Sequence, residues 1–189
     1  MAKAVERLRN GQTVEIEYRV NESEDYQRWV SIQGKPIRTD DGEVARVVGF
    51  ITDVTERKER EQRLREFQRA VESSGHGIYC TDRDGVINRV NPAFEEISGY
   101  TAEEAIGEAP AMLRSGKHEQ AFYEDLWETI LDGDVWHGEV INERKDGEHY
   151  IIDQTIAPVT DESGETTGFV AVNADVTEQR ATERELEIL

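Results

Sequence analysis

Apolar and polar residues alternate along three stretches near the end of the chain, at residues 135–144, 148–158 and 166–174. A period of two sends successive side chains to opposite faces of a strand, so each stretch is predicted to be a half-buried β-strand. Lys145-Asp-Gly147 and Asp161-Glu-Ser-Gly164, which separate them, have the composition of tight turns. The pattern therefore predicts an antiparallel meander.

Two shorter apolar runs, residues 77–81 and 86–90, flank Asp84-Gly85 and predict a β-hairpin. Helical signals follow the hairpin, because Asn91-Pro92 suits a helix start and Thr101 with Glu104 forms a capping-box pattern. The predicted helices cover residues 91–99, 101–107 and 119–131. Two strands, several short helices and three strands together predict an α+β domain with an antiparallel sheet.

The chain repeats itself at a constant offset of 122 residues, which carries Asp53-Val-Thr-Glu56 onto Asp175-Val-Thr-Glu178 and Pro36 onto Pro158. A fixed offset without gaps means that one structural unit occurs twice. The chain then holds one complete unit and, before it, the second half of another. We expect the half-unit to leave an apolar sheet face uncovered, which a partner or further residues would cover.

Four segments follow from this repeat. Residues 1–57 are predicted to be the second half of a first domain, 58–74 a connecting helix, 75–179 a complete second domain, and 180–189 the start of an exit helix. The connecting segment carries Leu64, Phe67 and Val71 on one stripe, which either pairs with a partner helix or rests on its own domain.

The same motif begins both helices that leave the sheets. Asp53 and Asp175 are expected to cap the amides ahead of them, and Glu56 and Glu178 stand at the reciprocal capping-box position. We therefore expect a signal-relay role for these residues and the threonines between them. The expected relay residues are Asp53, Thr55, Glu56, Asp175, Thr177 and Glu178.

The net charge of the chain indicates which kinds of partner it can bind. The chain has 41 Asp and Glu against 22 Lys and Arg, a net charge of −19 that repels phosphate backbones and disfavours nucleic-acid binding. The scarcity of lysine resembles proteins of salt-loving archaea, with an ordinary acidic bacterial protein as the alternative. A single cysteine, Cys80, allows no intramolecular disulfide, and no apolar run reaches membrane-spanning length, so a cytoplasmic location is expected.

Strand alternation also predicts which side chains line the interior of the complete unit. Asn142, Gln154 and Asn173 fall on inward-facing positions of the last three strands, amid apolar neighbours. The candidate cavity lining is completed by Trp136, Ile152, Phe94 and Met112.

The repeat provides an internal comparison for these three amides, because Val20, Ile32 and Ile51 stand at the same positions of the half-unit. A buried amide without partners costs roughly 1–3 kcal/mol. Either a ligand or ordered water satisfies the amides, or they bond to one another. Both interpretations stay open.

The motifs together resemble a known family. Asn91-Pro-Ala-Phe94, Ser98-Gly-Tyr100, Asn142-Glu-Arg-Lys-Asp-Gly147, Thr155-Ile-Ala-Pro158 and the terminal Asp-Val-Thr-Glu resemble a PAS domain of the S-box type over residues 68–179. Residues 6–57, with Tyr26-Gln-Arg-Trp29, resemble the C-terminal (PAC) half of another. The resemblance implies a five-stranded antiparallel sheet of order 2-1-5-4-3, with short helices on one face around a cavity.

The second unit is similar to flavin-binding PAS domains, both the light-sensing LOV type and the redox-sensing type, so the resemblance makes flavin (FAD or FMN) the best cofactor candidate. Pro110 occupies the position of the LOV cysteine, which excludes thiol-adduct photochemistry, while redox-type domains tolerate proline there. Ile152 replaces a ring-binding asparagine. Haem requires an axial ligand, for which His118 is the one weak candidate, and no metal-site spacing is found.

The resemblance implies a sensory or dimerising module of a signalling protein, with a histidine kinase or other output domain elsewhere and no enzymatic activity of its own. We expect it to sense a small ligand, redox state or oxygen, or to mediate homodimerisation through its PAS faces and linker helices. The alternative is a ligand-free scaffold for oligomerisation.

Overall fold

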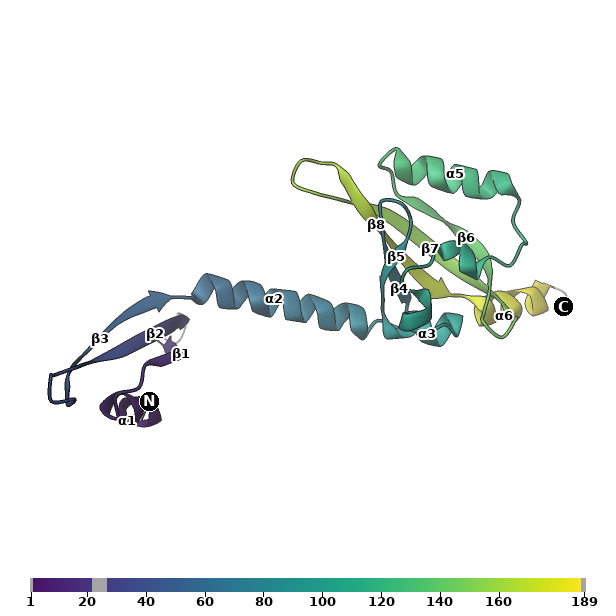
Figure 1. The fold of residues 1–189 in the computed structure, drawn as a ribbon. Coiled ribbons are helices and arrows are strands. Elements are labelled where there is room, and N and C mark those ends of the chain that lie inside the picture. Colours follow the sequence, from purple (N-terminus) through teal and green to yellow (C-terminus); the bar gives the residue numbers. More distant parts are fainter. Residues whose placement is uncertain (1, 22–26, 188–189) are drawn as a thin grey trace. The chain divides into compact units, whose positions relative to one another are not determined.

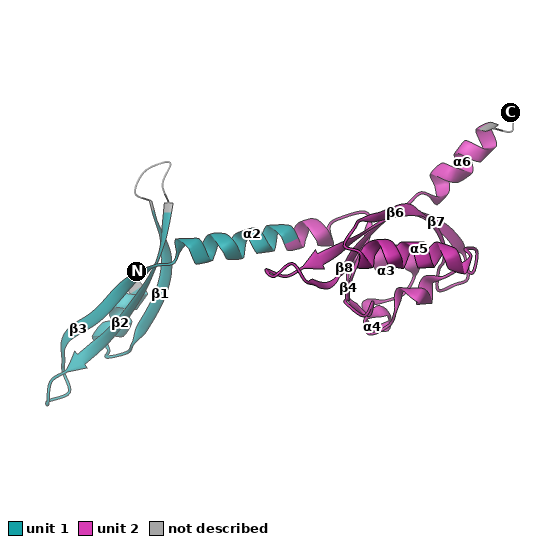
Figure 2. Ribbon diagram, turned by 90° about the horizontal axis from the view of Figure 1, so that it is seen from above, with its two compact units in different colours: residues 1–67 teal, residues 68–189 magenta. Residues whose placement is uncertain are grey.

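The computed structural model describes residues 2–21 and 27–187. The chain divides into two compact units, residues 1–67 and residues 68–189 (Figure 2). Tyr26, quoted in one of the sequence motifs, lies outside the described residues.

The second unit contains a five-stranded antiparallel sheet of order β5-β4-β8-β7-β6 (Figure 1). Numbered along the unit, this is the order 2-1-5-4-3 expected from the sequence, and the α+β class is confirmed. Its strands are β4 (Gly77–Asp82), β5 (Ile87–Val90), β6 (Trp136–Glu143), β7 (His149–Thr160) and β8 (Thr166–Asp175). Its helices are α3 (Pro92–Ser98), α4 (Ala102–Ala105), the 3-10 helix η1 (Pro110–Leu113), α5 (Gln120–Leu131) and α6 (Thr177–Glu187).

The core of this unit lies between the inner face of the sheet and the short helices. Burial alternates along β6, β7 and β8 as the sequence predicts, because a strand presents every second side chain to the same face. From the helices, Phe94, Ala105, Leu126 and Ile130 close the other side and are at most 7% exposed. The predicted loop through Pro110 contains η1, which supplies the buried Leu113.

Asn91 joins the hairpin to the helices. Its carboxamide oxygen accepts hydrogen bonds from the backbone amides of Ile78 (2.7 Å) and Phe94 (3.0 Å), so it caps α3 and holds the start of β4. Its amide nitrogen donates to the carbonyls of Val71 and His76, both at 3.0 Å. Gly99 ends α3 in the left-handed region at φ 77°, a conformation that glycine adopts without a Cβ penalty.

The first unit repeats the second half of this architecture. Helix α1 (Ala2–Arg9) precedes a three-stranded antiparallel sheet of order β1-β2-β3. Its elements are β1 (Val14–Asn21), β2 (Gln27–Arg38), β3 (Val44–Asp53) and the first turns of α2 (Thr55–Glu72). Leu8 of α1 lies against the sheet at Gly34, where an added Cβ would come within 3.2 Å of it.

Strand β3 lies at an edge, whereas its counterpart β8 lies inside the five-stranded sheet. Its apolar side chains are consequently exposed, with Phe50 at 64% and Ile51 at 67%. The expectation that the half-unit leaves an apolar sheet face uncovered is therefore met within the described residues.

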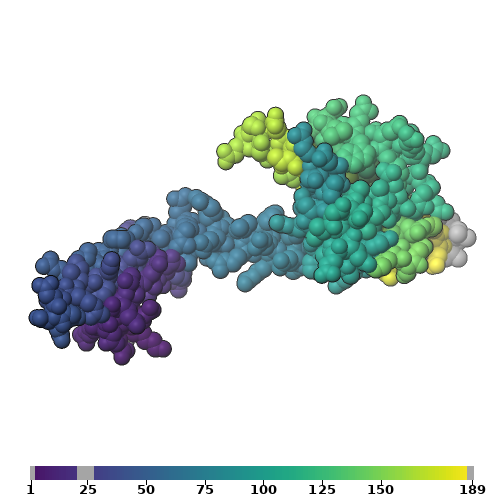
Figure 3. Space-filling model, in the orientation of Figure 1, coloured from purple at the N-terminus to yellow at the C-terminus, as the bar shows by residue number. Residues whose placement is uncertain are grey.

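One expectation about the helices that leave the sheets was wrong, and one of the two alternatives for the stripe on α2 is not met. Helices α2 and α6 begin at Thr55 and Thr177, so Glu56 and Glu178 are second residues and not at the reciprocal capping-box position. The Glu56 carboxylate pairs with Arg60 one turn later, at 2.7 Å. The Leu64 and Phe67 part of the stripe on α2 does not rest on its own domain, because these side chains are 58% and 69% exposed. Figure 3 shows the chain in space-filling form, coloured along the sequence.

Replacement of Asn91 by alanine is expected to lower the free energy of unfolding of the second unit by about 2–3 kcal/mol, since it removes an N-cap and leaves buried backbone groups unpaired. Urea denaturation monitored by tryptophan fluorescence measures this. The matched control is Asn88→Ala on the exposed side of β5, for which we expect a change within about 0.5 kcal/mol. Equal effects of the two variants would contradict the assigned role of Asn91.

Candidate functional site

The second unit encloses a cavity of about 230 Å³ between the sheet and the helices η1 and α5. Much of its wall is apolar and includes Leu126, Trp127, Ile130, Val140 and Phe169. Polar side chains also reach the wall, and they are Tyr79, Thr81, Arg114, Tyr123, Asn142 and Gln154. An apolar pocket with a few convergent polar groups is the usual form of a small-molecule site.

Gln154 is the centre of one polar cluster. Its amide nitrogen donates to the Asn173 side-chain oxygen at 2.8 Å and to the Tyr79 hydroxyl at 3.2 Å. Antiparallel pairing places Gln154 directly opposite Asn173 and so brings the two amides together. Burial raises the pKa of Tyr79 well above its ordinary value, so this hydroxyl stays protonated.

Asn142 belongs to a second cluster with Tyr150, its cross-strand partner on β7. Burial raises the pKa of Tyr150 to about 12, although a hydrogen bond with the Asn142 side chain acts in the opposite direction. The Arg144 guanidinium lies 4.4 Å from the centre of the Tyr150 ring, a cation–π distance. The two clusters show that the buried amides obtain at least some of their hydrogen bonds within the protein.

Two hydroxyls on the cavity wall remain without a hydrogen-bond partner among the described residues. They are the Thr81 and Tyr123 oxygens, both buried, and the Thr81 side chain is only 7% exposed. A buried polar group left unpaired costs about 1–3 kcal/mol. Polar atoms of a molecule held inside the cavity could supply the missing hydrogen bonds.

The cavity wall includes only part of the lining expected from the sequence. Asn142 and Gln154 reach it, whereas Asn173 lies behind Gln154. Trp136, Ile152, Phe94 and Met112 are not among the residues that line this cavity and belong to the surrounding core. Their contact with a ligand stays a prediction.

Packing explains the displacement of the large side chains. The Trp136 ring covers Gly138, where an added Cβ would lie 2.8 Å from it, and its indole nitrogen is 3.4 Å from an Asp125 oxygen. Phe94 packs edge-on against Tyr79, with ring centres 5.9 Å apart. Alternation along β4 could have identified Tyr79 and Thr81 from the sequence, since both occupy its buried positions.

The histidines do not offer a haem ligand at the cavity. Nε2 of His118 accepts a hydrogen bond from the Ile141 amide at 2.8 Å and is therefore engaged. His137 and His149 face outward as expected and lie near Asp153 and Glu143, at 2.7 and 3.3 Å. Within the described residues, no group of three or more His, Cys, Asp and Glu side chains could hold a metal ion.

The side chains on the cavity wall suit a flavin ring, whereas the cavity volume is small for one. Amides and hydroxyls beside aromatic and aliphatic side chains suit the polar edge and apolar face of such a ring. The cavity is nevertheless smaller than the usual range of about 300–1,000 Å³. An outer pocket of about 570 Å³ shares Arg114, Tyr123 and Trp127 with the cavity and extends the available space toward solvent.

The threonine of the repeated motif ties each exit helix to the neighbouring strand. The Thr177 hydroxyl accepts from the Ile151 amide at 3.0 Å, and the Thr55 hydroxyl accepts from the Trp29 amide at 2.8 Å. The backbone amide of each threonine donates to the preceding aspartate, at 3.0 Å for Asp175 and 2.9 Å for Asp53. Both units therefore fix the start of the helix to the sheet by the same bonds.

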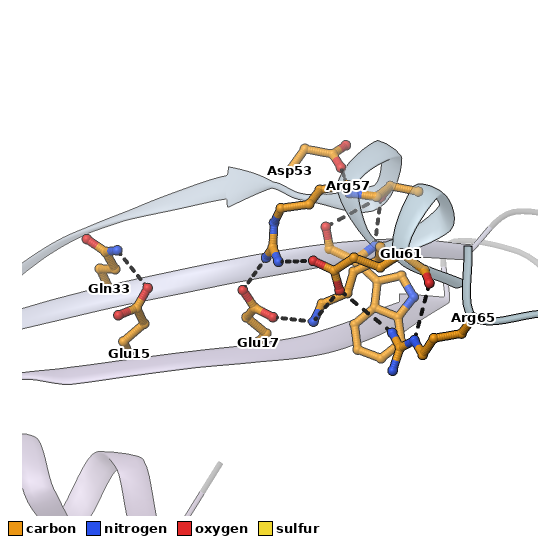
Figure 4. Close-up of polar contacts among 10 residues, drawn as sticks. Glu15, Glu17, Gln33, Asp53, Arg57, Glu61 and Arg65 are labelled. Atoms are coloured by element: carbon orange, nitrogen blue, oxygen red, sulfur yellow. Dashed lines mark hydrogen bonds and ion pairs between the residues drawn. The ribbon is translucent and has the colours of Figure 1, made fainter. Parts of the chain in front are cut away.

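An ion pair repeats with the same offset. Glu17 on β1 contacts Lys58 on α2 at 2.6 Å, and Glu139 on β6 contacts Arg180 on α6 at 2.8 Å. Arg57 also reaches Glu17 and pairs with Glu61 (Figure 4). These groups are partly exposed to solvent, so we assign them an orienting role and little stability.

Arg144 connects the cavity wall to the exit helix. Its guanidinium bonds to the Asp175 carboxylate at 2.8 Å while lying against Tyr150, the partner of Asn142. Burial raises the pKa of Asp175, but the Thr177 and Arg144 hydrogen bonds outweigh it and hold that pKa below its ordinary value. Contacts thus run without a gap from Asn142 through Tyr150, Arg144 and Asp175 to Thr177.

Comparisons with known proteins agree with this architecture. The chain is 32% identical over 116 residues to a nitrogen fixation regulatory protein of Klebsiella oxytoca, covering 61% of this chain and 23% of that protein. It is 28% identical over 155 residues to a bacterioopsin transcriptional activator of Halobacterium salinarum, covering 82% and 22%. It is 31% identical over 122 residues to a blue-light photoreceptor of Listeria monocytogenes, covering 63% and 48%. The chain therefore spans less than half the length of each of these relatives.

No helix in the described part of the chain is long and apolar enough to cross a membrane.

Among solved structures, a PAS domain from Colwellia psychrerythraea superposes with a TM-score of 0.58 at 26% identity, covering 61% of this chain and 98% of that one. Two family models described as PAS fold match residues 65–176 and residues 1–51. The chain belongs to the PAS family, with one complete PAS domain and part of a second.

Proposed function

We propose that this chain is the sensory segment of a larger signalling protein, in which the cavity of the second PAS domain binds a small ligand. The observation that carries the proposal is the pair of buried hydroxyls of Thr81 and Tyr123 on the cavity wall, for which the described residues offer no hydrogen-bond partner. They define where a ligand atom gains hydrogen bonds that the protein alone does not make.

Flavin is the ligand best supported by the residues. Asn142, Gln154 and Thr81 would hold the polar edge of its ring, beside Trp127 and Phe169. When bound, a flavin supplies electron-transfer chemistry, so its redox state would be the signal. The blue-light photoreceptor among the relatives supports this choice. Because Pro110 occupies the LOV cysteine position, we propose redox sensing and not thiol-adduct photochemistry.

The contacts of Arg144 offer a route for the output. A ligand that changes the hydrogen bonding of Asn142 would alter its bond with Tyr150, and Arg144 would transmit the change to Asp175. The start of α6 would then shift between two states, provided that the ligand binds them unequally. The output domain, for which a histidine kinase is one candidate, would be attached beyond this helix.

A second candidate function, a scaffold for homodimers, is favoured by the exposed strand β3. The Val54 amide donates to the Trp29 carbonyl on β2, so the backbone groups of Val54 point toward β2. Because the direction of these groups alternates along an antiparallel strand, those of Val47, Gly49 and Ile51 point away from β2. Two copies paired antiparallel about Gly49 would place Val47 opposite Ile51. Such a self-complementary edge suits a two-fold dimer.

Protein purified from its native host is expected to carry a small molecule, seen as flavin bands in the absorption spectrum or by mass spectrometry. Asn142→Val and Gln154→Ile, which introduce the residues of the first unit at these positions, should each reduce retained ligand about tenfold, the effect of one lost hydrogen bond. Thr155→Val on the outer face of β7 is the control. A protein without any bound molecule, or full retention in both variants, would contradict the sensory site.

Thr177→Val is expected to loosen the start of α6, since the Ile151 amide loses its acceptor at a cost of about 1–2 kcal/mol. Hydrogen exchange should show the first turn of α6 opening about tenfold more often, while ligand retention stays within about twofold. The control is Thr182→Val, whose hydroxyl bonds only to the Glu178 carbonyl among the described residues. No difference between these variants would argue against the relay.

If β3 mediates homodimerisation, the double variant Val47→Lys with Ile51→Lys should weaken the dimer at least about tenfold, because paired edge lysines repel and lose apolar burial. Analytical ultracentrifugation measures the dissociation constant. Val135→Lys with Val159→Lys makes the same charge change at exposed sites of the second unit and should have no effect. A wild-type chain that stays monomeric would refute the scaffold.

A further inference from the structure

The segment between η1 and α5, residues 114–118, covers the free edge of the five-stranded sheet; we call it the strap. Strand β6 lies at that edge, and no other strand among the described residues pairs with its outward side. The strap supplies partners for both groups of Ile141. The Ser115 hydroxyl donates to the Ile141 carbonyl, and Nε2 of His118 accepts from the Ile141 amide at 2.8 Å.

The hydrogen bond from the Ile141 amide defines the protonation state of the His118 ring. A ring nitrogen accepts a hydrogen bond only when it carries no proton, so the imidazole is neutral with its hydrogen on Nδ1. The ring stacks on Phe122 with centres 4.1 Å apart and an interplanar angle of 20°. Burial lowers the pKa of His118 below its ordinary value of 6.5, which keeps this acceptor available at neutral pH.

The charged groups around His118 do not replace this bond. On the strap, Arg114 lies with its guanidinium 3.9 Å from the Tyr123 ring centre, and Lys117 is exposed. On α5, Glu124 accepts from the Gln120 amide at 2.7 Å. His149 on β7 shares a shallow pocket with Lys117 and Ile141. No ion pair of His118 with a carboxylate is found in the described part of the chain.

The strap also forms the rim of the cavity. Arg114 pairs with Asn142 in an isolated bridge, and Arg114, Tyr123 and Trp127 line both the cavity and the outer pocket. His118 lines the outer pocket beside them. Release of the strap from β6 would therefore widen the passage from solvent to the cavity.

We propose that His118 is a pH-sensitive latch, whose protonation breaks the bond to Ile141, releases the strap and opens the cavity in acid. We infer the opening of the strap from the contacts of His118 and Ser115 with Ile141. The effect of this opening on a bound ligand rests on the proposed function. Protonated His118 has donors at both nitrogens, which leaves the Ile141 amide without an acceptor.

The sign of the pH effect follows from linkage. The folded state holds His118 neutral, so its pKa there is lower than in the unfolded state. The stabilising contribution is present above about pH 6.5, the unfolded value, and is lost as the pH falls below it. Because one proton opens the latch, the open population should rise about tenfold per pH unit in the acid range.

The test uses the full chain and follows the protection factor of the Ile141 amide by hydrogen exchange between pH 7.5 and 5, while NMR titrates His118. Protection in the wild type should fall about tenfold per pH unit once His118 begins to protonate. His118→Gln places an amide oxygen near the Nε2 position without a titrating proton, so its Ile141 protection should not depend on pH. His118→Phe, which lacks an acceptor, should be unprotected throughout.

The matched control is His137→Gln, because His137 lies on the outer face near Asp153, and it should respond as the wild type does. Wild-type protection that does not change with pH, or an unchanged pH response in His118→Gln, would overturn the latch. The amide measurement needs no ligand. Failure to retain a ligand would thus count against the proposed function alone, and a pH-independent strap against the latch alone.

Discussion

A primary amide that is buried in an apolar interior must find hydrogen-bond partners, and the inner face of the second PAS domain carries three of them. Strand pairing solves this locally, because Gln154 stands opposite Asn173 and Asn142 opposite Tyr150. The register of the sheet and the satisfaction of the amides therefore depend on each other. A one-residue slip would turn the amides outward and bring polar neighbours such as Asp153 into the core.

The two units show what the same backbone does with different interiors. Val20, Ile32 and Ile51 of the first unit need no hydrogen bonds where the second unit has amides. Both units keep the same start of the helix that follows the last strand, because Thr55 and Thr177 make the same hydrogen bonds to the neighbouring strand. The interiors of the two units differ, while the bonds that fix the start of the following helix are the same.

Alternation along the chain predicted the strands, the buried rows and the outward histidines, because alternation is a local property of a strand, whereas the sheet order followed from the family resemblance. Sequence patterns predicted Asn142 and Gln154 of the cavity wall but not its remaining residues, because those depend on how large side chains turn. Trp136 lies over Gly138, and Phe94 lies against Tyr79, so neither reaches the cavity. Helix starts were misplaced by one residue because Asp53 and Asp175 still belong to their strands. The role of His118 emerged only from its contact with β6.

The carboxylate of Asp175 is shared between Arg144 and Thr177, and this sharing has a thermodynamic consequence. If occupancy of the cavity biases the exit helix, a partner that captures the helix in one state must bias the cavity by the same factor. The affinity for the small molecule then becomes a property of the whole signalling assembly. Measurements on the isolated segment would report only one of its two limiting values.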